Sequence, residues 1–306
     1  MSAKTPSPAV HGVVLVDKPL GLTSQSVVSR LKRLYGAHKA GHAGTLDPMA
    51  TGLLPICLGA ATKFSQSGLE ADKAYEAIVR LGQTRVGGDM EGEIIAQAPV
   101  DFAPEKLEIV LRRFTGAQQQ IPPMHSALKV QGRPLYAYAR QGIDIDRQPR
   151  QITIHELRLL SRTDDSLNLF IRCSKGTYIR TLAEDIGQAL GCGAHLTSLR
   201  RVAIAHLNIS QAYPLDDLLI GAEQQLAQAL RPVDSLVSEW PVVTLNHDDA
   251  ARFLCGMRRQ GIWKDTACAR VYGPENGAFL GTGHIVAGEL IADRLLSPSE
   301  VSCLLH

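Results

Sequence analysis

The 306-residue sequence contains no apolar run long enough to cross a membrane. It also lacks the two glycine-rich phosphate-binding patterns, GxGxxG and GxxxxGK(S/T). Its six cysteines form no CxxC pair and show no Cys/His spacing of the zinc type. The apolar run at residues 13–16 is too short for the core of a signal peptide. These absences argue against a membrane protein, a nucleotide-dependent enzyme and a structural metal site. They favour a cytoplasmic protein with reduced, mostly buried thiols.

The length and the 45% hydrophobic content allow one large domain and one small one. The net charge of +2 says little about partners, but the charges are unevenly distributed. Residues 18–39 hold five cations and no acid, and residues 129–150 hold five cations and two acids. Residues 216–239 hold five acids and one arginine. This asymmetry suits a polyanionic partner on one surface, although solvated helix faces would give the same pattern.

The stretch from Gly41 to Pro55, GHAGTLDPMATGLLP, is dominated by turn-forming residues and contains a single carboxylate, Asp47. Pro48 disfavours helical dihedrals at Asp47, so this carboxylate lies on a stiff bend. An Asp-Pro turn would explain an isolated pair of this kind. A plain turn, however, needs only about four residues, and this segment continues with the period of neither a helix nor a strand. We therefore predict a loop that presents Asp47 for chemistry.

The same stretch, together with VDKPLGLTS at residues 16–24 and KGTYIR at residues 175–180, resembles the signature motifs of the TruB family, the bacterial tRNA pseudouridine-55 synthases. The resemblance is close from about Gly12 to Val202 and covers the rest in outline. It implies an α+β fold: a mixed, mainly antiparallel central sheet flanked by helices and loops (the pseudouridine synthase fold), with a small C-terminal β-barrel of the PUA type.

The patterns along the chain predict three parts: a flexible tail at residues 1–11, a large domain at 12–238 and a small one at 239–306. The resemblance implies that the large domain is catalytic and that the small one is a PUA-like RNA-binding domain. Trp240-Pro241 follows the acidic segment, and regularly spaced glycines beyond it suggest a small β-barrel. Residues 118–150 fit neither period and carry prolines, cations and tyrosines. We interpret them as an irregular insertion that contacts RNA; a mobile loop is the alternative.

Hydrophobic periodicity predicts the individual elements. Strands are expected over residues 12–16, 75–81, 152–160, 167–173 and 196–202, with 152–160 and 167–173 forming a hairpin. One helix follows Ser24 as its N-cap and ends at Gly36, and another begins at Pro104 and ends before Gly116. A third follows the KGTYIR motif and ends at Gly191.

The resemblance assigns the catalytic role to Asp47. Converting uridine to pseudouridine breaks the N-glycosidic bond and rejoins the uracil through carbon. A carboxylate nucleophile divides this step into easier ones. It attacks either C1′ of the sugar or C6 of the base, and the sequence leaves both open. A carboxylate in a closed pocket stays ionised beside a cation. We assign that role to Arg180, although an ordinary structural salt bridge would look identical in sequence.

Five further residues are expected to bind the substrate. By resemblance, His42 fills the place that the extruded uridine leaves, and Tyr75 and Tyr178 pack against the uracil. Tyr178 could also move a proton. Leu199 supplies an apolar wall, and Lys18 braces the loop or a phosphate. Without the resemblance, the two tyrosines and the leucine would be interpreted as core residues, and the histidine as structural.

The predicted protein is a stand-alone tRNA pseudouridine synthase that acts on uridine 55 in the T-arm loop; a further role in tRNA folding stays open. We expect a monomer with tRNA as its partner, and no cofactor, metal, membrane, obligatory protein or guide RNA. Three alternatives are an RNA-binding protein with a decayed active site, a guide-RNA-dependent relative and another glycosidic-bond enzyme. The last would ordinarily need a second carboxylate in the loop.

Overall fold

The computed structural model describes residues 10–126, 128–274 and 277–305. The predicted tail at residues 1–11 lies outside the described residues, except for its last two positions. The chain forms two compact units. The first comprises the residues up to Pro48, Gly52–Glu70 and the chain from His206 onward, and the second comprises Met49–Thr51 and Ala71–Ala205. Among the described residues, no helix is long and apolar enough to span a membrane.

The first unit is built around strand β1 (Gly12–Lys18), which contains the predicted strand and extends it to Lys18. β1 pairs antiparallel with β3 (Ala50–Leu58). At its other edge it pairs parallel with the short strand β14 (Tyr213–Pro214) and antiparallel with β15 (Leu230–Arg231). The strand β2 (Ala40–His42) pairs with β3. Val13, Val14 and Val16 of β1 are fully buried, as expected for a strand covered on both faces.

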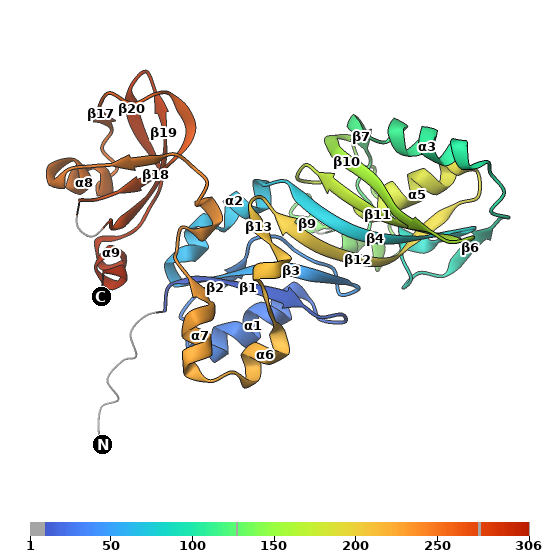
Figure 1. Ribbon diagram of the computed structural model, residues 1–306, viewed down its shortest axis with the longest axis horizontal. Helices are drawn as coiled ribbons and strands as arrows, with labels where there is room; N and C mark the ends of the chain where they lie inside the picture. The colour runs from blue at the N-terminus through green and yellow to red at the C-terminus, as the bar shows by residue number, and fades with distance from the viewer. Residues whose placement is uncertain (1–9, 127, 275–276, 306) are drawn as a thin grey trace. The chain divides into compact units, whose positions relative to one another are not determined.

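Helix α1 (Ser24–Leu34) follows β1 and buries the predicted apolar stripe. Its N-cap is Thr23, whose hydroxyl accepts a hydrogen bond from the amide of Ser26. The prediction that Ser24 caps this helix was therefore wrong. Figure 1 shows α1 near α6 and α7 in this unit. The remaining short elements of this part of the unit are η1 (Gly59–Phe64), α2 (Ser65–Glu70), β13 (Leu207–Asn208), η3 (Ile209–Gln211), α6 (Leu215–Ile220), α7 (Glu223–Ala229) and η4 (Ser235–Val237).

The C-terminal residues of the first unit form a five-stranded sheet in the order β16-β18-β19-β20-β17. Its strands are β16 (Val242–Thr244), β17 (Arg259–Gln260), β18 (Thr266–Tyr272), β19 (Phe279–Val286) and β20 (Glu289–Leu295), and its helices are α8 (His247–Leu254) and α9 (Pro298–Leu304). Phe253, Val271 and Leu290 are fully buried in a hydrophobic core of its own. This small β-structure confirms the C-terminal fold that the glycine spacing predicted. The exact boundary at residue 239 stays a prediction.

Two contacts anchor this sheet within the first unit. The rings of Phe64 in η1 and Phe279 in β19 lie 5.1 Å apart between centroids. The Arg270 guanidinium lies 3.0 Å from the carboxylate of Asp234, and the Tyr272 hydroxyl donates to the same carboxylate at 2.5 Å. Burial raises the pKa of Tyr272 to about 12, and the hydrogen bond to Asp234 adds to that effect. The phenol therefore keeps its proton and remains a donor.

The second unit is an antiparallel sheet in the order β12-β4-β11-β10-β7. Its strands are β4 (Lys73–Leu81), β7 (Gly116–Gln120), β10 (Arg150–Arg162), β11 (Ser166–Cys173) and β12 (Ala194–Ile204). The helices α3 (Pro104–Arg113) and α5 (Ile179–Leu190) contact each other and the sheet, and Figure 1 shows both on one side of it. Outside the sheet lie β5 (Gln83–Arg85), η2 (Val86–Gly88) and β6 (Ile94–Gln97). The predicted strands, hairpin and helices of this region are confirmed, as is the α+β class.

The segment at residues 118–150 is more regular than predicted. Gln118–Gln120 belong to β7, which pairs with β10 from Arg150 onward. Between these strands lie a hairpin of β8 (Lys129–Val130) and β9 (Arg133–Pro134) and the short helix α4 (Leu135–Ala139). Pairing with β10 satisfies the backbone of β7 at the sheet edge, although its glutamines show no alternation of polar and apolar residues. The insertion proper therefore starts after Gln120.

Candidate active site

Asp47 lies in the first unit, in an irregular segment at residues 43–49, and is partly exposed. The rest of the predicted loop is more regular than expected, because residues 41–42 end β2 and residues 50–55 belong to β3. The Ser24 hydroxyl accepts a hydrogen bond from the Leu46 amide at 2.8 Å and donates to the Leu46 carbonyl at 2.9 Å. The Pro48 carbonyl accepts a bond from the Gly21 amide at 2.8 Å. Both residues that flank Asp47 are thus tied to the segment at the start of α1. Because the backbone is fixed on both sides, the carboxylate starts from a defined position.

Lys18 binds the same loop through its ammonium group. Its side chain is fully buried. Its ammonium group donates to the carbonyls of Pro19 at 2.9 Å and Leu22 at 2.7 Å, and reaches the Pro48 carbonyl at 3.5 Å. A buried ammonium needs such partners because it cannot be left unsolvated. These contacts fit the bracing role expected for Lys18.

His42 is the last residue of β2, five positions before Asp47. It is partly exposed, and its Nδ1 accepts a hydrogen bond from the Gly44 amide at 3.4 Å. This bond leaves Nε2 as the nitrogen that carries the proton in the neutral ring. The expected stacking of His42 in the place of an extruded base stays a prediction.

Tyr75 and Leu199 lie on neighbouring strands of the second unit. Leu199 of β12 is the register partner of Ala77, and Arg201 is the register partner of Tyr75. Tyr75 and Leu199 are each 9% exposed, so each keeps a small accessible area. The two predicted residues therefore lie two positions apart along one strand pair. Arg201 was not among the residues predicted for the site.

Tyr178 is the N-cap residue of α5. Its amide donates to Oε1 of Gln120 at 2.8 Å, and its carbonyl accepts from Nε2 of Gln120 at 3.1 Å. Gln120 is 5% exposed, so a buried side-chain amide from β7 fixes the backbone on which Tyr178 is carried. Sequence reasoning missed Gln120 because it lies 58 positions from Tyr178.

Arg180 lies in the first turn of α5 and is almost completely buried. One guanidinium nitrogen donates to the Asp89 carboxylate at 3.0 Å and to the Gly87 carbonyl at 3.4 Å. The other donates to the His125 carbonyl at 2.7 Å. Asp89 was not predicted; the only local signal was its position after two glycines. The expected pairing of Arg180 with Asp47 stays a prediction.

Glu184 adds a second carboxyl group near Arg180 on the same helix. A Cβ placed on Gly88 would lie 2.7 Å from the carboxyl carbon of Glu184, so this carboxyl packs against the glycine backbone. Burial, together with the charges of Asp185 and Asp89, raises the pKa of Glu184 to about 7, and the charge of Arg180 opposes this shift. At neutral pH the cluster therefore combines one strong ion pair with one carboxyl group near its titration point.

The insertion after Gln120 presents arginine side chains over tyrosine rings. The guanidinium carbon of Arg133 lies 4.7 Å from the Tyr138 ring centroid, and that of Arg140 lies 5.4 Å from the Tyr136 centroid. Tyr136 is 41% exposed. Each pair places a positively charged guanidinium group over a flat aromatic ring. Bases stack on such rings, and phosphates bind to such cations.

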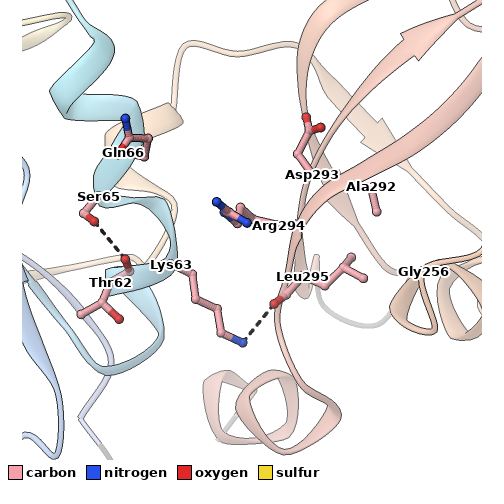
Figure 2. Close-up of a pocket in the computed structure, with 9 residues that line it drawn as sticks. All are labelled: Thr62, Lys63, Ser65, Gln66, Gly256, Ala292, Asp293, Arg294 and Leu295. Carbon is pink, nitrogen blue, oxygen red and sulfur yellow. Dashed lines mark hydrogen bonds between the residues drawn. The ribbon is translucent and has the colours of Figure 1, made fainter. Parts of the chain in front are cut away.

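An open cavity of about 640 Å³ lies in the first unit between the η1–α2 segment and β20 (Figure 2). Figure 2 shows the Arg294 side chain extending from β20 into this space, and the Ser65 hydroxyl donating to the Thr62 carbonyl. Lys63 lines it too, and its ammonium donates to the Leu295 carbonyl at 3.0 Å and to the Glu300 carboxylate. The lining is polar and carries charges of both signs, because Asp293 lies there beside Arg294 and Lys63.

The predicted residues thus fall into two groups, one in each unit. Asp47, His42 and Lys18 belong to the first unit, and Tyr75, Tyr178, Arg180 and Leu199 belong to the second. In the second group, Tyr75 and Leu199 lie on the paired strands β4 and β12, and Gln120 of β7 is hydrogen-bonded to Tyr178. The structure adds Asp89, Gln120 and Arg201 to this group. No metal-binding cluster of three or more His, Cys, Asp or Glu side chains occurs in the described part of the chain.

Comparison with protein families gives three consecutive matches. Residues 32–179 match the N-terminal domain of the TruB family pseudouridylate synthases. Residues 180–238 match the tRNA pseudouridylate synthase B C-terminal domain, and residues 241–296 match the C-terminal model of pseudouridine synthase II TruB. These matches define the class of protein as a pseudouridylate synthase.

Curated relatives cover nearly the whole chain. The tRNA pseudouridine synthase B of Verminephrobacter eiseniae is 49% identical over 303 residues, which is 97% of this chain and 92% of the relative. That of Cupriavidus pinatubonensis is 50% identical over 303 residues and 96% of both chains. The chain belongs to the TruB family.

Solved structures agree with this assignment at the level of the fold. A chain in a Cbf5-Nop10-Gar1 complex superposes with a TM-score of 0.72 at 25% identity, covering 95% of this chain and 86% of that chain. A chain in an H/ACA RNP bound to a substrate RNA containing 2′-deoxyuridine gives a TM-score of 0.70 at 24% identity, with 95% and 86% covered. The predicted pseudouridine synthase fold is confirmed.

Proposed function

We propose that this protein is a tRNA pseudouridine synthase that converts uridine 55 of the T-arm loop to pseudouridine, with Asp47 as the nucleophile. The observation that carries the proposal is the Asp47 loop itself. Its backbone is fixed by Ser24 on one side and by Gly21 and Lys18 on the other. It occurs in a chain 49% identical to a tRNA pseudouridine synthase B.

The chemistry needs a nucleophile and an ordered base. The N1–C1′ bond breaks and a C5–C1′ bond forms, while a proton is lost from C5 and one is gained at N1, so the atoms and electrons balance without a co-reactant. Attack of the Asp47 carboxylate divides the exchange into easier steps: at C1′ it displaces the uracil, which later displaces the carboxylate through C5, and at C6 it adds to the ring and is eliminated after the new bond forms. The uracil must rotate in its own plane between bond breaking and bond formation. The site must therefore leave the edges of the ring free to turn while side chains pack against its two faces.

Each predicted residue has a part in this reaction. Extruding the uridine costs on the order of a few kcal/mol, which stacking and hydrogen bonds must offset. Tyr75 and Tyr178 pack against the uracil and Leu199 closes the pocket, while His42 occupies the vacated place in the loop. Arg180 keeps Asp47 ionised by its positive charge. The Tyr178 hydroxyl transfers the proton lost from C5.

RNA contacts extend beyond the site. The tyrosine–arginine pairs of the insertion offer stacking surfaces for the T-arm. The cavity lined by Lys63 and Arg294 offers cations to the phosphate backbone. The protein carries its own RNA-binding surface, so we propose a cytoplasmic monomer that needs neither a guide RNA nor a protein partner. A role in refolding tRNA would use the same surface.

Mass mapping of a tRNA transcript tests the proposal. Wild-type protein should form pseudouridine at position 55, whereas Asp47→Asn should form none and bind tRNA within about tenfold, because the amide keeps the shape and loses the nucleophile. Asp101→Asn, at an exposed side chain outside the insertion, is the matched control and should react normally. Undiminished turnover by Asp47→Asn would overturn the mechanism. Tight binding by an inactive wild-type protein would favour an RNA-binding protein with a decayed site.

A further inference from the structure

A buried arginine lies directly behind one of the predicted substrate-binding residues. Arg201 of β12 is 1% exposed and is one of the largest fully buried side chains among the described residues. It is the register partner of Tyr75 across the β12–β4 pair and forms a hydrogen bond with the Tyr75 side chain. Burial lowers the pKa of Arg201, and the contact with Tyr75 opposes that shift. The tyrosine therefore helps to keep the guanidinium charged.

The backbone of β12 is irregular around this arginine. The pairing register with β4 shifts between Leu196 and Ser198 and again between Arg201 and Ala203. β-Bulges of this kind change the direction of side chains and are common beside active sites. The regular segment between the two shifts holds both Leu199 and Arg201. The strand is thus shaped to present these two residues.

The hydrogen bond to Tyr75 can run in only one direction. A guanidinium has five N–H donors and no acceptor, so Arg201 donates and the phenolic oxygen accepts. The proton of the Tyr75 hydroxyl must then point away from Arg201. Because one end of the phenol is anchored, the ring also loses freedom to rock within its pocket. Both effects act on the part of the Tyr75 side chain that would contact a bound uracil.

The surroundings of Arg201 add to the cost of burying its charge. Lys73 lies two positions before Tyr75 on β4 and is also buried. Burial lowers the pKa of Lys73 to about 8, with the Arg201 charge as the next cause. Burial raises the pKa of the neighbouring Cys173 thiol to about 12, so this thiol is neutral and offers no counter-charge. A buried cation does not by itself indicate that the residue stabilises the fold, because an apolar side chain of similar volume often gives equal or greater stability.

We propose that Arg201 is a positioning residue for the reaction, which acts by anchoring the hydroxyl oxygen of Tyr75 and thereby fixing the ring that packs against the uracil. This inference rests on the proposed function. It places the role of Arg201 in the ordering of the bound base and not in tRNA affinity. Its loss should lower the rate of the chemical step, because a misplaced base reacts slowly even when the RNA is fully bound.

A double-mutant cycle tests whether Arg201 acts through the tyrosine oxygen. Under single turnover with saturating tRNA, Arg201→Met should lower the rate constant by about 10- to 100-fold, the usual effect of losing a charged hydrogen bond. Its tRNA affinity should stay within about threefold, and Arg201→Lys should recover part of the rate because it restores a donor. In the Tyr75→Phe background, which has no oxygen to anchor, the same Arg201→Met change should cost less than about threefold. Equal penalties in the two backgrounds would overturn the proposal.

A second measurement does not depend on activity. The seven tyrosines, labelled with ¹³C at Cζ, give separate resonances, and Tyr75→Phe identifies the one that belongs to Tyr75. Arg201→Met should move that resonance, whereas Arg158→Met, at an exposed arginine of β10, should leave it in place. An unmoved resonance in folded Arg201→Met protein would overturn the contact. If wild-type protein made no pseudouridine, the proposed function would fail and the catalytic part of this inference with it, while the resonance would still report on the anchor.

Discussion

The Asp47 loop and the start of α5 hold their predicted functional side chains by different physical means. The loop is held by hydrogen bonds in which the acceptors are backbone carbonyls and the Ser24 hydroxyl. The start of α5 is held by a buried ion pair between Arg180 and Asp89, with the titratable Glu184 beside it. The first arrangement should therefore be insensitive to pH near neutrality, and the second should respond to it. One unit holds the proposed nucleophile by hydrogen bonds to its backbone, and the other holds a carboxyl group that titrates near neutral pH.

Breaking the ion pair should have the largest effect. Asp89→Asn removes the carboxylate from the buried Arg180–Asp89 ion pair, and losing one member of a buried pair costs about 3–5 kcal/mol. We expect the free energy of unfolding to fall by that amount and kcat/KM to fall on the order of 100-fold. Denaturant titration and steady-state kinetics measure the two quantities.

The matched control is Asp165→Asn, which breaks an ion pair with Arg80; the two side chains are 43% and 44% exposed. Exposed pairs contribute about 0–1 kcal/mol, so this variant should stay close to wild type. If Asp89→Asn unfolded at the same denaturant concentration as Asp165→Asn, the buried pair would not be the element that holds Arg180.

Loosening the loop should have an intermediate effect. Ser24→Ala removes two hydrogen bonds to Leu46 and leaves its amide and carbonyl without that partner, at a cost of about 1–3 kcal/mol in unfolding free energy. The rate of pseudouridine formation should fall about tenfold because Asp47 loses its fixed starting position. Ser29→Ala is the control, since its exposed hydroxyl only donates to the Gln25 carbonyl within α1. Equal rates for the two variants would show that the loop keeps its shape without Ser24.

The smallest effect should come from the titrating group. The folded-state pKa of Glu184 is raised to about 7 from the ordinary value of 4.5. The folded protein therefore binds the proton more tightly than the unfolded chain, and stability falls as the pH rises from 4.5 to 7. Glu184→Gln should remove this loss, so its unfolding midpoint should exceed that of wild type at pH 8 and the difference should shrink toward pH 4.5.

Thermal unfolding between pH 4.5 and pH 8 measures this difference. Glu108→Gln, at an exposed position of α3, is the control and should show no such trend. The Asp47 loop offers no comparable acid-to-amide control, because Asp47 itself is the only carboxylate between Gly41 and Pro55. A pH-independent difference for Glu184→Gln would mean that its carboxyl does not titrate in this range.

Local patterns were sufficient for much of the second unit. The alternation in β4 and β11, the hairpin between β10 and β11, and the glycine that ends α5 all depend on neighbours within a few positions. The Asp47 loop was predictable for the same reason, because Pro48 and the glycines act on their own backbone.

Two errors show where such patterns fail. Thr23 and Ser24 are both good helix caps, and only the position of Leu46, 22 residues further on, decides that Ser24 bonds to the loop. Gln118–Gln120 show no strand period, and only the edge of β10 makes them a strand. In both cases a distant partner outweighs the local preference.

By itself, the sequence determined the family motifs, the stiff bend that carries Asp47 and the order of most helices and strands, since all of these follow from residues that are close together in the chain. Only the tertiary structure decided which groups surround the predicted side chains. Arg180 meets Asp89 across 91 positions, and Tyr178 meets Gln120 across 58. Hydrogen bonds and ion pairs act over about 3 Å in space regardless of separation in sequence, so these partners could be found only after the chain had folded.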